Sequence, residues 1–213
     1  MDKTILVFGA SVEWGSGDRE GGWVQRLNKH LYGKHLKLGD DFYCPIYNLG
    51  IPGNDSQDLL DRMGNEIIVR KKGTRDAAII IAIGCNDSQF NNKEKSFRVP
   101  PERFRENLAK LTSIAKEYTN EVVFVGIHAI DDSRVDPIPW KPEASYKMEY
   151  VKQYNEIIQE FCREREMPFV DVLSEFMKTD YIKMFEDGVH PNPEGHELIF
   201  RLVRDCLEKK GII

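Results

Sequence analysis

Residues 77–87 read Ala-Ala-Ile-Ile-Ile-Ala-Ile-Gly-Cys-Asn-Asp, and this stretch decides the expected fold. Its apolar run is rich in β-branched isoleucine and predicts a strand from Ala77 to Ile83. The residues from Ile79 to Ile83 leave no polar position for a solvated face. Such a strand is typical of the centre of a parallel sheet that helices cover on both sides.

The rest of the chain repeats this alternation of short apolar runs and amphipathic stretches. Further strands are predicted at Thr4 to Phe8, Tyr43 to Asn48, Glu121 to Ile127 and Pro168 to Val170. Apolar residues recur at helical spacing in four sets: Leu59, Leu60, Met63, Ile67; Phe104, Leu108, Leu111, Ala115; Val151, Tyr154, Ile158, Phe161; and Leu198, Leu202, Cys206. We interpret each set as the core-facing stripe of a helix. The alternation predicts an α/β protein, and without linkers or repeats we expect one domain over residues 1–213.

Composition excludes several classes of protein. The 213 residues include 30 Lys and Arg against 35 Asp and Glu, a net charge of −5 without long charged blocks. A nucleic-acid-binding protein needs concentrated basic residues, so this chain is not expected to bind nucleic acid. The apolar run from Ile5 to Phe8 is too short for a signal peptide or a membrane span, which predicts a cytoplasmic protein. The four cysteines lack C-x-x-C spacing and are expected to be reduced, with no metal site.

Polar residues follow the predicted strands at their carboxyl ends, where open parallel sheets bind ligands. The segments concerned are Gly9–Gly15, Asn48–Asp55, Gly84–Asp87 and, before the last predicted helix, Asp187–Asn192. That helix is expected to begin after Asn192, because Asn is a favoured capping residue and Pro193 suits the first helical position. These four segments together predict one site.

The residue types in these segments suit nucleophilic catalysis. A serine hydroxyl is a weak nucleophile unless a base removes its proton, and histidine has a suitable pKa for that role. We therefore predict Ser11 as nucleophile and His190 as base. Asp187 lies three residues before His190 with Gly188 between them, so a tight turn would let its carboxylate orient the imidazole.

Attack on an ester carbonyl creates an oxyanion that needs prearranged hydrogen-bond donors. The predicted donors are the backbone N–H groups of Ser11 and Gly53 and the side-chain amide of Asn86. Each such donor is worth on the order of 3 kcal/mol in the transition state.

These segments, in this order, resemble the SGNH hydrolase superfamily, which includes the GDSL esterases and lipases. The resemblance spans Ile5 to His190 and places the family's serine on Ser11, its glycine on Gly53, its asparagine on Asn86, and its Asp-x-x-His on Asp187 and His190. The chain departs from the name-giving Gly-Asp-Ser-Leu, which here reads Gly9-Ala10-Ser11-Val12. The resemblance implies that the family's aspartate hydrogen-bonds nearby backbone and is not part of the triad. Its replacement by Ala10 should therefore loosen the turn that carries Ser11, unless another group compensates for the loss.

The resemblance implies a three-layer α/β/α sandwich of flavodoxin-like type, with five parallel strands in the order 2-1-3-4-5. It implies a serine ester hydrolase that forms an acyl-enzyme on Ser11 and needs no metal or organic cofactor. Small acyl esters, including acetylated sugars, are favoured over long lipids because no long apolar lid is visible. Acyl transfer to an acceptor other than water, and the oligomeric state, stay open.

Several readings compete with this one. His128 ends the fourth predicted strand and is the rival for the base, or else contacts substrate. Trp14 and Trp140, in loops near the site, are further candidates for substrate contact. The whole protein could instead be a flavodoxin-like nucleotide- or carbohydrate-binding protein without catalysis, or a silent relative of the hydrolases. The turn from Gly9 to Gly15 matches neither common phosphate-binding motif, which disfavours nucleotide binding.

Overall fold

The computed structural model describes residues 1–71 and 76–213 and is built around a five-stranded parallel sheet. The strands are β1 (Lys3–Gly9), β2 (Ile46–Gly50), β3 (Asp76–Ala82), β6 (Glu121–Val125) and β8 (Phe169–Val170). They are ordered β2-β1-β3-β6-β8, which confirms the predicted order 2-1-3-4-5. β3 pairs with β1 and β6, and from Ala77 onward every residue in it is buried, as its apolar sequence predicts.

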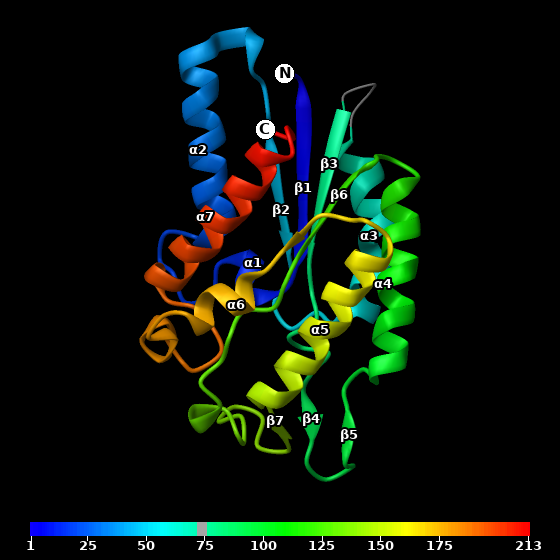
Figure 1. Ribbon diagram of the computed structural model, residues 1–213, viewed down its shortest axis with the longest axis vertical. Coiled ribbons are helices and arrows are strands. Elements are labelled where there is room, and N and C mark those ends of the chain that lie inside the picture. The colour runs from blue at the N-terminus through cyan, green and yellow to red at the C-terminus, as the bar shows by residue number, and fades with distance from the viewer. Residues whose placement is uncertain (72–75) are drawn as a thin grey trace.

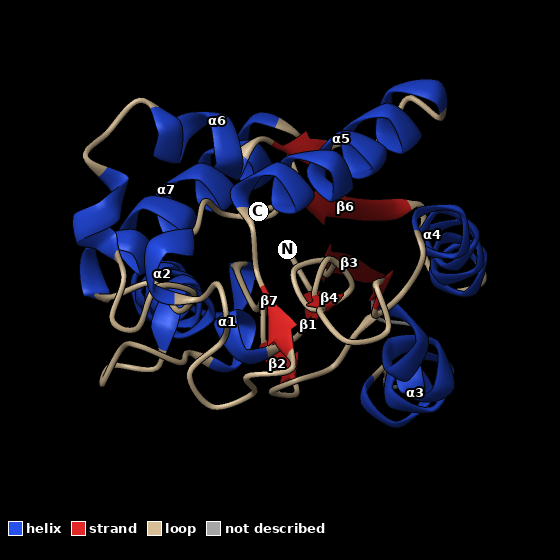
Figure 2. Ribbon diagram, turned by 90° about the horizontal axis from the view of Figure 1, so that it is seen from below, coloured by secondary structure: helices blue, strands red, loops and turns tan. Residues whose placement is uncertain are grey.

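Helices cover both faces of this sheet, so the three predicted layers are confirmed (Figures 1 and 2). One layer contains α3 (Ser56–Arg70), α4 (Pro101–Lys116) and α5 (Met148–Glu164). The other contains α1 (Ser11–Trp14), α2 (Gly22–Leu38), α6 (Val172–Met177) and α7 (Pro193–Lys209). Short 3-10 turns occur at Gly39–Asp41, Asp132–Arg134 and Tyr181–Met184.

The last helix begins where the sequence predicts. The Asn192 side chain accepts hydrogen bonds from the backbone N–H groups of Glu194 and Gly195, and Pro193 is the first helical residue. An asparagine cap and an N-terminal proline both favour a helix start at this point. The cap therefore sets the end of the loop that carries His190.

Three elements differ from their predictions by two residues or more, or in their buried face. β6 ends at Val125 and not at Ile127. β2 begins at Ile46 and not at Tyr43, because Pro45 has no N–H to donate to a strand ladder and Tyr43 forms an isolated bridge with Asp2. In α7 the expected stripe is half-buried and packs at the edge of the core, whereas the fully buried positions lie one residue later, at Ile199, Val203 and Leu207. Both stripes are apolar, so periodicity alone could not separate them.

A small antiparallel sheet was not predicted. It is formed by β4 (Phe90–Asn91), β5 (Ser96–Phe97) and β7 (Ala144–Ser145), in the order β5-β4-β7. It lies beyond the carboxyl ends of the parallel strands, at the lower end of Figure 1. Strands of two residues have too few positions to show an alternating pattern. This sheet brings the segments before α4 and before α5 together beside the site.

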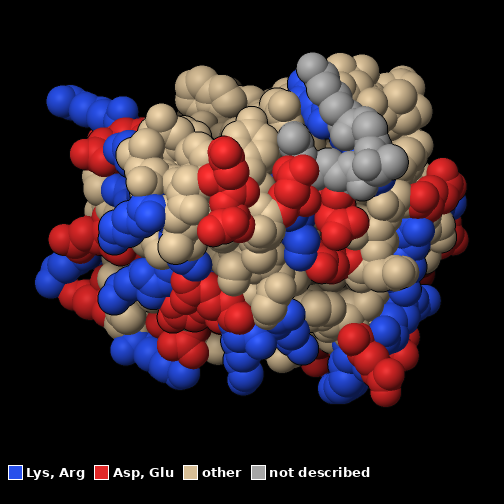
Figure 3. Space-filling view, turned by 90° about the horizontal axis from the view of Figure 1, so that it is seen from above, with Lys and Arg blue, Asp and Glu red and all other residues tan. Residues whose placement is uncertain are grey.

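Acidic and basic side chains alternate on the face seen in Figure 3, where no continuous basic patch forms over the described residues. Within the described part of the chain, no helix is long and apolar enough to cross a bilayer. The four cysteines are free thiols; Cys44 and Cys162 are buried and Cys85 and Cys206 are half-buried.

Candidate active site

Ser11, His190 and Asp187 form one chain of hydrogen bonds. His190 Nε2 lies 2.9 Å from Ser11 Oγ, and His190 Nδ1 lies 2.7 Å from Asp187 Oδ2. A carboxylate can only accept, so Nδ1 carries the proton and Nε2 offers a lone pair to the serine hydroxyl. The structure thus joins three residues that the sequence separates by up to 179 positions. This arrangement can remove the proton from Ser11.

The loop before α7 holds Asp187 and His190 in this geometry. Asp187 Oδ1 accepts hydrogen bonds from the backbone N–H groups of Val189, at 3.0 Å, and His190, at 2.8 Å. Gly188 has a φ of +101°, a backbone conformation that glycine adopts without steric cost. Burial would raise the pKa of Asp187, but its hydrogen bonds with the His190 side chain and backbone lower it to about 2. The carboxyl is therefore ionised at neutral pH.

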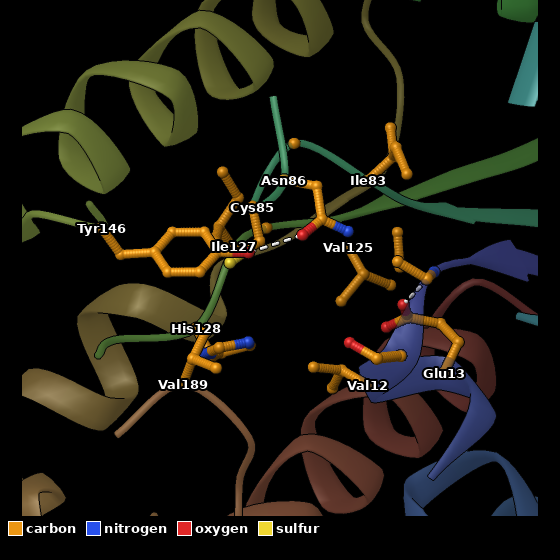
Figure 4. Close-up of a pocket in the computed structure, with 15 residues that line it drawn as sticks. Val12, Glu13, Ile83, Cys85, Asn86, Val125, Ile127, His128, Tyr146 and Val189 are labelled. Carbon is orange, nitrogen blue, oxygen red and sulfur yellow. Dashed lines mark hydrogen bonds between the residues drawn. The ribbon is translucent and has the colours of Figure 1, made fainter. Parts of the chain in front are cut away.

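Asn86 follows β3, and three hydrogen bonds orient its side-chain amide. Its Nδ2 donates to the carbonyl of Asn54 at 2.9 Å. Its Oδ1 accepts from the Tyr146 hydroxyl at 2.5 Å and from Gln89 Nε2 at 3.3 Å, and Figure 4 shows Tyr146 pointing at Asn86. With Oδ1 held by two donors, the amide nitrogen is the end left to face the cavity beside Ser11.

The two backbone donors are placed differently. Ser11 is the first residue of α1, and the N–H groups of a helix's first turn have no intrahelical acceptor. Gly53 lies in the exposed loop after β2 with a φ of +82°, and its carbonyl accepts from Arg98 at 2.9 Å. The contact between Asn86 and Asn54 sets this loop beside Asn86. Gly53 is not among the described residues that line the cavity, and its part in an oxyanion hole stays a prediction.

Glu13 supplies a buried carboxylate to the turn that carries Ser11. Its Oε2 accepts from the Ala10 backbone N–H at 2.8 Å, and its Oε1 accepts from Trp23 Nε1 at 3.3 Å. The side chain lies so close to Gly9 that a Cβ there would be 2.3 Å from Oε2. Burial raises the pKa of Glu13 to about 7. A carboxylate thus binds the nucleophile turn although position 10 has none.

The short helix α1 sits directly on the end of β2. A Cβ at Gly50 would lie 2.5 Å from the Trp14 nitrogen and 2.7 Å from the Ala10 carbonyl oxygen, so only glycine allows this approach. Asn48 stabilises the same contact between α1 and β2, because its Nδ2 donates a hydrogen bond to the Glu13 carbonyl at 2.6 Å. The backbone that presents Ser11 is therefore fixed from two sides.

A cavity opens next to Ser11, with a volume of about 40 Å³ (Figure 4). Its walls come from the ends of β1, β3 and β6, with Tyr146 and Val189 closing the side. The lining is mostly apolar, and its polar or ionisable side chains are Ser11, Glu13, Cys85, Asn86, His128 and Tyr146. Volume on this scale holds on the order of one to three water-sized groups.

The three predicted substrate contacts take different positions. Trp14 and Trp140 are exposed by 59% and 56%, and the Trp140 ring stacks on His190 with ring centres 6.3 Å apart. His128 is buried and lines the cavity. The Ser11 hydroxyl donates to His190 Nε2, whereas His128 Nδ1 lies 2.6 Å from the Ala129 carbonyl oxygen. The geometry therefore favours His190 over His128 as the base.

Comparison with known proteins identifies the family. Residues 7–198 match the GDSL-like lipase/acylhydrolase family, which is nearly the whole chain. The chain belongs to this family. The resemblance stated from the sequence is thereby confirmed, and the GDSL-like family is known for esterases and lipases.

Curated relatives align along almost the entire chain. The isoamyl acetate-hydrolyzing esterase 1 homolog of Bos taurus is 24% identical, over 97% of this chain and 82% of its own length. The GDSL esterase/lipase CPRD49 of Arabidopsis thaliana is 23% identical, over 95% of this chain and 79% of its own length.

Solved structures share the fold. A lipase/acylhydrolase from Enterococcus faecalis superimposes with a TM-score of 0.74 at 22% identity, covering 98% of this chain and 96% of its own. An acetylxylan esterase from Geobacillus stearothermophilus gives a TM-score of 0.72 at 22% identity, covering 97% and 94%.

Sequence reasoning missed three residues that shape this site. Glu13 was visible inside the segment Gly9–Gly15 but was given no role, although a carboxylate three residues after Ala10 was a usable signal. Tyr146 had no signal, because the pairing of β4 with β7 brings it to Asn86 from 60 residues away. Gln89 lies only three residues after Asn86, and its amide was given no role. Among the described residues, no group of three His, Cys, Asp or Glu side chains could hold a metal ion.

Proposed function

We propose that this member of the GDSL-like family is a serine ester hydrolase that cleaves small acyl esters through an acyl-enzyme on Ser11. The observation that carries the proposal is the hydrogen-bonded chain from Ser11 through His190 to Asp187 beside the Asn86 amide. Residues 1–213 act as a single hydrolase domain in the cytoplasm.

Each group has a defined step in this reaction. His190 Nε2 takes the Ser11 proton as Oγ attacks the ester carbonyl, and Asp187 stabilises the imidazolium that forms. The Ser11 N–H, the Gly53 N–H and Asn86 Nδ2 stabilise the oxyanion. His190 then gives its proton to the leaving alcohol. It next removes a proton from water, which attacks the acyl-enzyme carbonyl, and it gives that proton to Ser11 Oγ as the acid leaves.

The size of the cavity favours short acyl groups. A cavity of about 40 Å³ beside Ser11 is closer in size to an acetyl or propanoyl chain than to an octanoyl chain. The exposed Trp140 ring stacks on His190, and the exposed Trp14 ring stands at the end of α1, the helix that begins at Ser11; both rings offer flat apolar surfaces to the alcohol part. Amphipathic rings of this kind suit the apolar face of a sugar. Acetylated sugars are therefore proposed among the substrates, in line with the acetylxylan esterase that shares the fold.

The test is hydrolysis of p-nitrophenyl esters from acetate to octanoate by the wild type, Ser11→Ala and His190→Asn. Circular dichroism confirms that each variant is folded. We expect activity to fall with acyl length in the wild type and to be lost in both variants. Equal activity in all three proteins would refute the assignment of Ser11 and His190. A folded wild type without activity would favour a binding protein without catalysis.

A further inference from the structure

His128 presents a buried nitrogen to the cavity beside Ser11. The residue follows β6, is 5% exposed and lines the cavity. Figure 4 shows its ring directed into the cavity, across from Asn86 and Val12. Phe176 and Phe185 pack near the ring, with centres 6.3 and 5.9 Å away, and hold it in place.

The ring's other nitrogen settles which atom carries the proton. His128 Nδ1 lies 2.6 Å from the Ala129 carbonyl oxygen, which can only accept a hydrogen bond. Nδ1 is therefore protonated. Burial lowers the pKa of His128 to about 4, so the ring is neutral at pH 7 and Nε2 is an acceptor.

This acceptor has no partner within the described ranges 1–71 and 76–213. A buried polar atom left without a hydrogen bond is costly in a folded protein, and such atoms are rare. The cavity wall around it is mostly apolar, with Ile83, Val125, Ile127 and Val189 among its members. An acceptor at one point of an apolar pocket selects for a group that carries a single donor.

We propose that the acyl group of the substrate carries a hydroxyl on its second or third carbon, which donates a hydrogen bond to His128 Nε2. This inference rests on the proposed function, because it places the acyl chain carried by Ser11 in the cavity that Ser11 and His128 both line. The pocket then binds a short hydroxyacyl group, with its carbon atoms against the apolar wall.

The surroundings argue for a neutral hydroxyl and against charged groups. An acyl chain ending in a carboxylate would meet a lone pair on Nε2, which repels it. An ammonium group would lose its hydration in this mostly apolar pocket, and the Glu13 carboxylate in the same lining is already bound by the Ala10 N–H and Trp23 Nε1. A hydroxyl satisfies the acceptor and carries no net charge into the pocket.

The test compares esters that differ only in this hydroxyl. Ethyl glycolate is matched with ethyl propionate, and ethyl 3-hydroxypropanoate with ethyl butyrate, using acid release in a pH-stat at pH 7. Each enzymatic rate is divided by the alkaline hydrolysis rate of the same ester, because a hydroxyl also activates the carbonyl. We expect the wild type to prefer the hydroxylated member of at least one pair by about tenfold in corrected kcat/KM.

Three variants locate the effect. His128→Leu should remove the preference while propionate or butyrate is still hydrolysed, and His128→Gln, which keeps an acceptor, should retain part of it. Val125→Ala enlarges the cavity without changing its polarity and should alter both members of a pair alike. The comparison of isosteric esters in the wild type holds even if a His128 variant does not fold.

The outcomes separate the two proposals. Hydrolysis of propionate or butyrate with no preference for the hydroxylated ester overturns the inference and leaves the hydrolase proposal intact. The same holds if His128→Leu is folded and keeps the preference. A wild type that hydrolyses neither member of any pair nor any p-nitrophenyl ester overturns both.

Discussion

The Glu13 carboxylate accepts a hydrogen bond from the Ala10 backbone N–H, with 2.8 Å between Oε2 and the nitrogen. The GDSL motif has an aspartate at the position of Ala10, directly before the nucleophile. In this chain the carboxylate belongs instead to Glu13, three residues after Ala10 in the first turn of α1. It also accepts a hydrogen bond from Trp23 Nε1. Glu13 therefore links the turn that carries Ser11 to α2 through hydrogen bonds.

The first prediction concerns this carboxylate. Glu13→Thr should lower kcat ten- to a hundredfold with little change in KM, because a misplaced nucleophile costs transition-state geometry more than substrate binding. Adding Ala10→Asp to Glu13→Thr should restore part of kcat by returning a carboxylate to the turn. Steady-state kinetics on p-nitrophenyl acetate measures both.

The control for this prediction is Glu20→Gln, since the Glu20 side chain is 66% exposed and lies in the following loop. It should leave kcat unchanged. If Ala10→Asp fails to raise kcat in a folded double variant, the two carboxylates are not equivalent and Glu13 has another role.

The second prediction is a pH dependence of stability. Burial raises the pKa values of Glu13 and Asp87 to about 7, well above their ordinary values near 4. The folded state thus holds more protons than the unfolded chain between about pH 4 and 7, so the free energy of unfolding falls as pH rises through this window. Glu13→Gln cannot ionise and should flatten the fall, as measured by urea denaturation at pH 5, 6, 7 and 8. An unchanged slope in this variant would contradict the assigned pKa.

The third prediction concerns the orientation of Asn86. Asn86→Ala should lower kcat by about 10²–10³-fold, as expected for loss of one oxyanion donor. Tyr146→Phe keeps the ring but removes the hydroxyl that donates to Asn86 Oδ1, and should lower kcat by about tenfold with KM nearly constant. A Tyr146→Phe enzyme with wild-type kcat would show that Gln89 and Asn54 suffice to hold the amide.

The fourth prediction concerns Asp187. Asp187→Asn should lower kcat by about 10³–10⁴-fold, because an amide cannot stabilise the imidazolium and can favour the wrong tautomer of His190. The variant should also lose the stability that depends on this carboxyl. The pKa of Asp187 is lowered to about 2, so in the wild type that contribution is present above pH 4 and is lost as pH falls toward 2. Kinetics at pH 8 and acid unfolding curves of both proteins test the two effects separately.

The fifth prediction concerns Trp140, which stacks on His190 and is more than half exposed. Trp140→Ala should raise KM for an acetylated sugar severalfold more than for ethyl acetate, because only the sugar covers the ring. Trp14→Ala is the matched variant on the other exposed ring. Equal effects on the two esters would place the alcohol part of the substrate elsewhere.

The sequence by itself determined the sheet and the identity of the main polar residues. Unbroken apolar runs such as Ile79 to Ile83 indicate strands that are buried on both faces. Such strands alternate with stretches of helical periodicity, and few topologies of a parallel sheet are compatible with that order. Because strand ends in such a sheet meet at one edge, the order of Ser11, Asn86, Asp187 and His190 along the chain already predicted one site.

Only the tertiary structure decided how those residues are held and what shape surrounds them. Tyr146 and Asn86 are 60 residues apart, and Glu13 meets Trp23 across two helices, so neither contact leaves a periodic trace in the sequence. The unpaired nitrogen of His128 is likewise a property of what packs around it. Periodicity indicates which face of an element is buried. The hydrogen-bond partner of a side chain depends instead on where the fold places loops that are distant in the sequence.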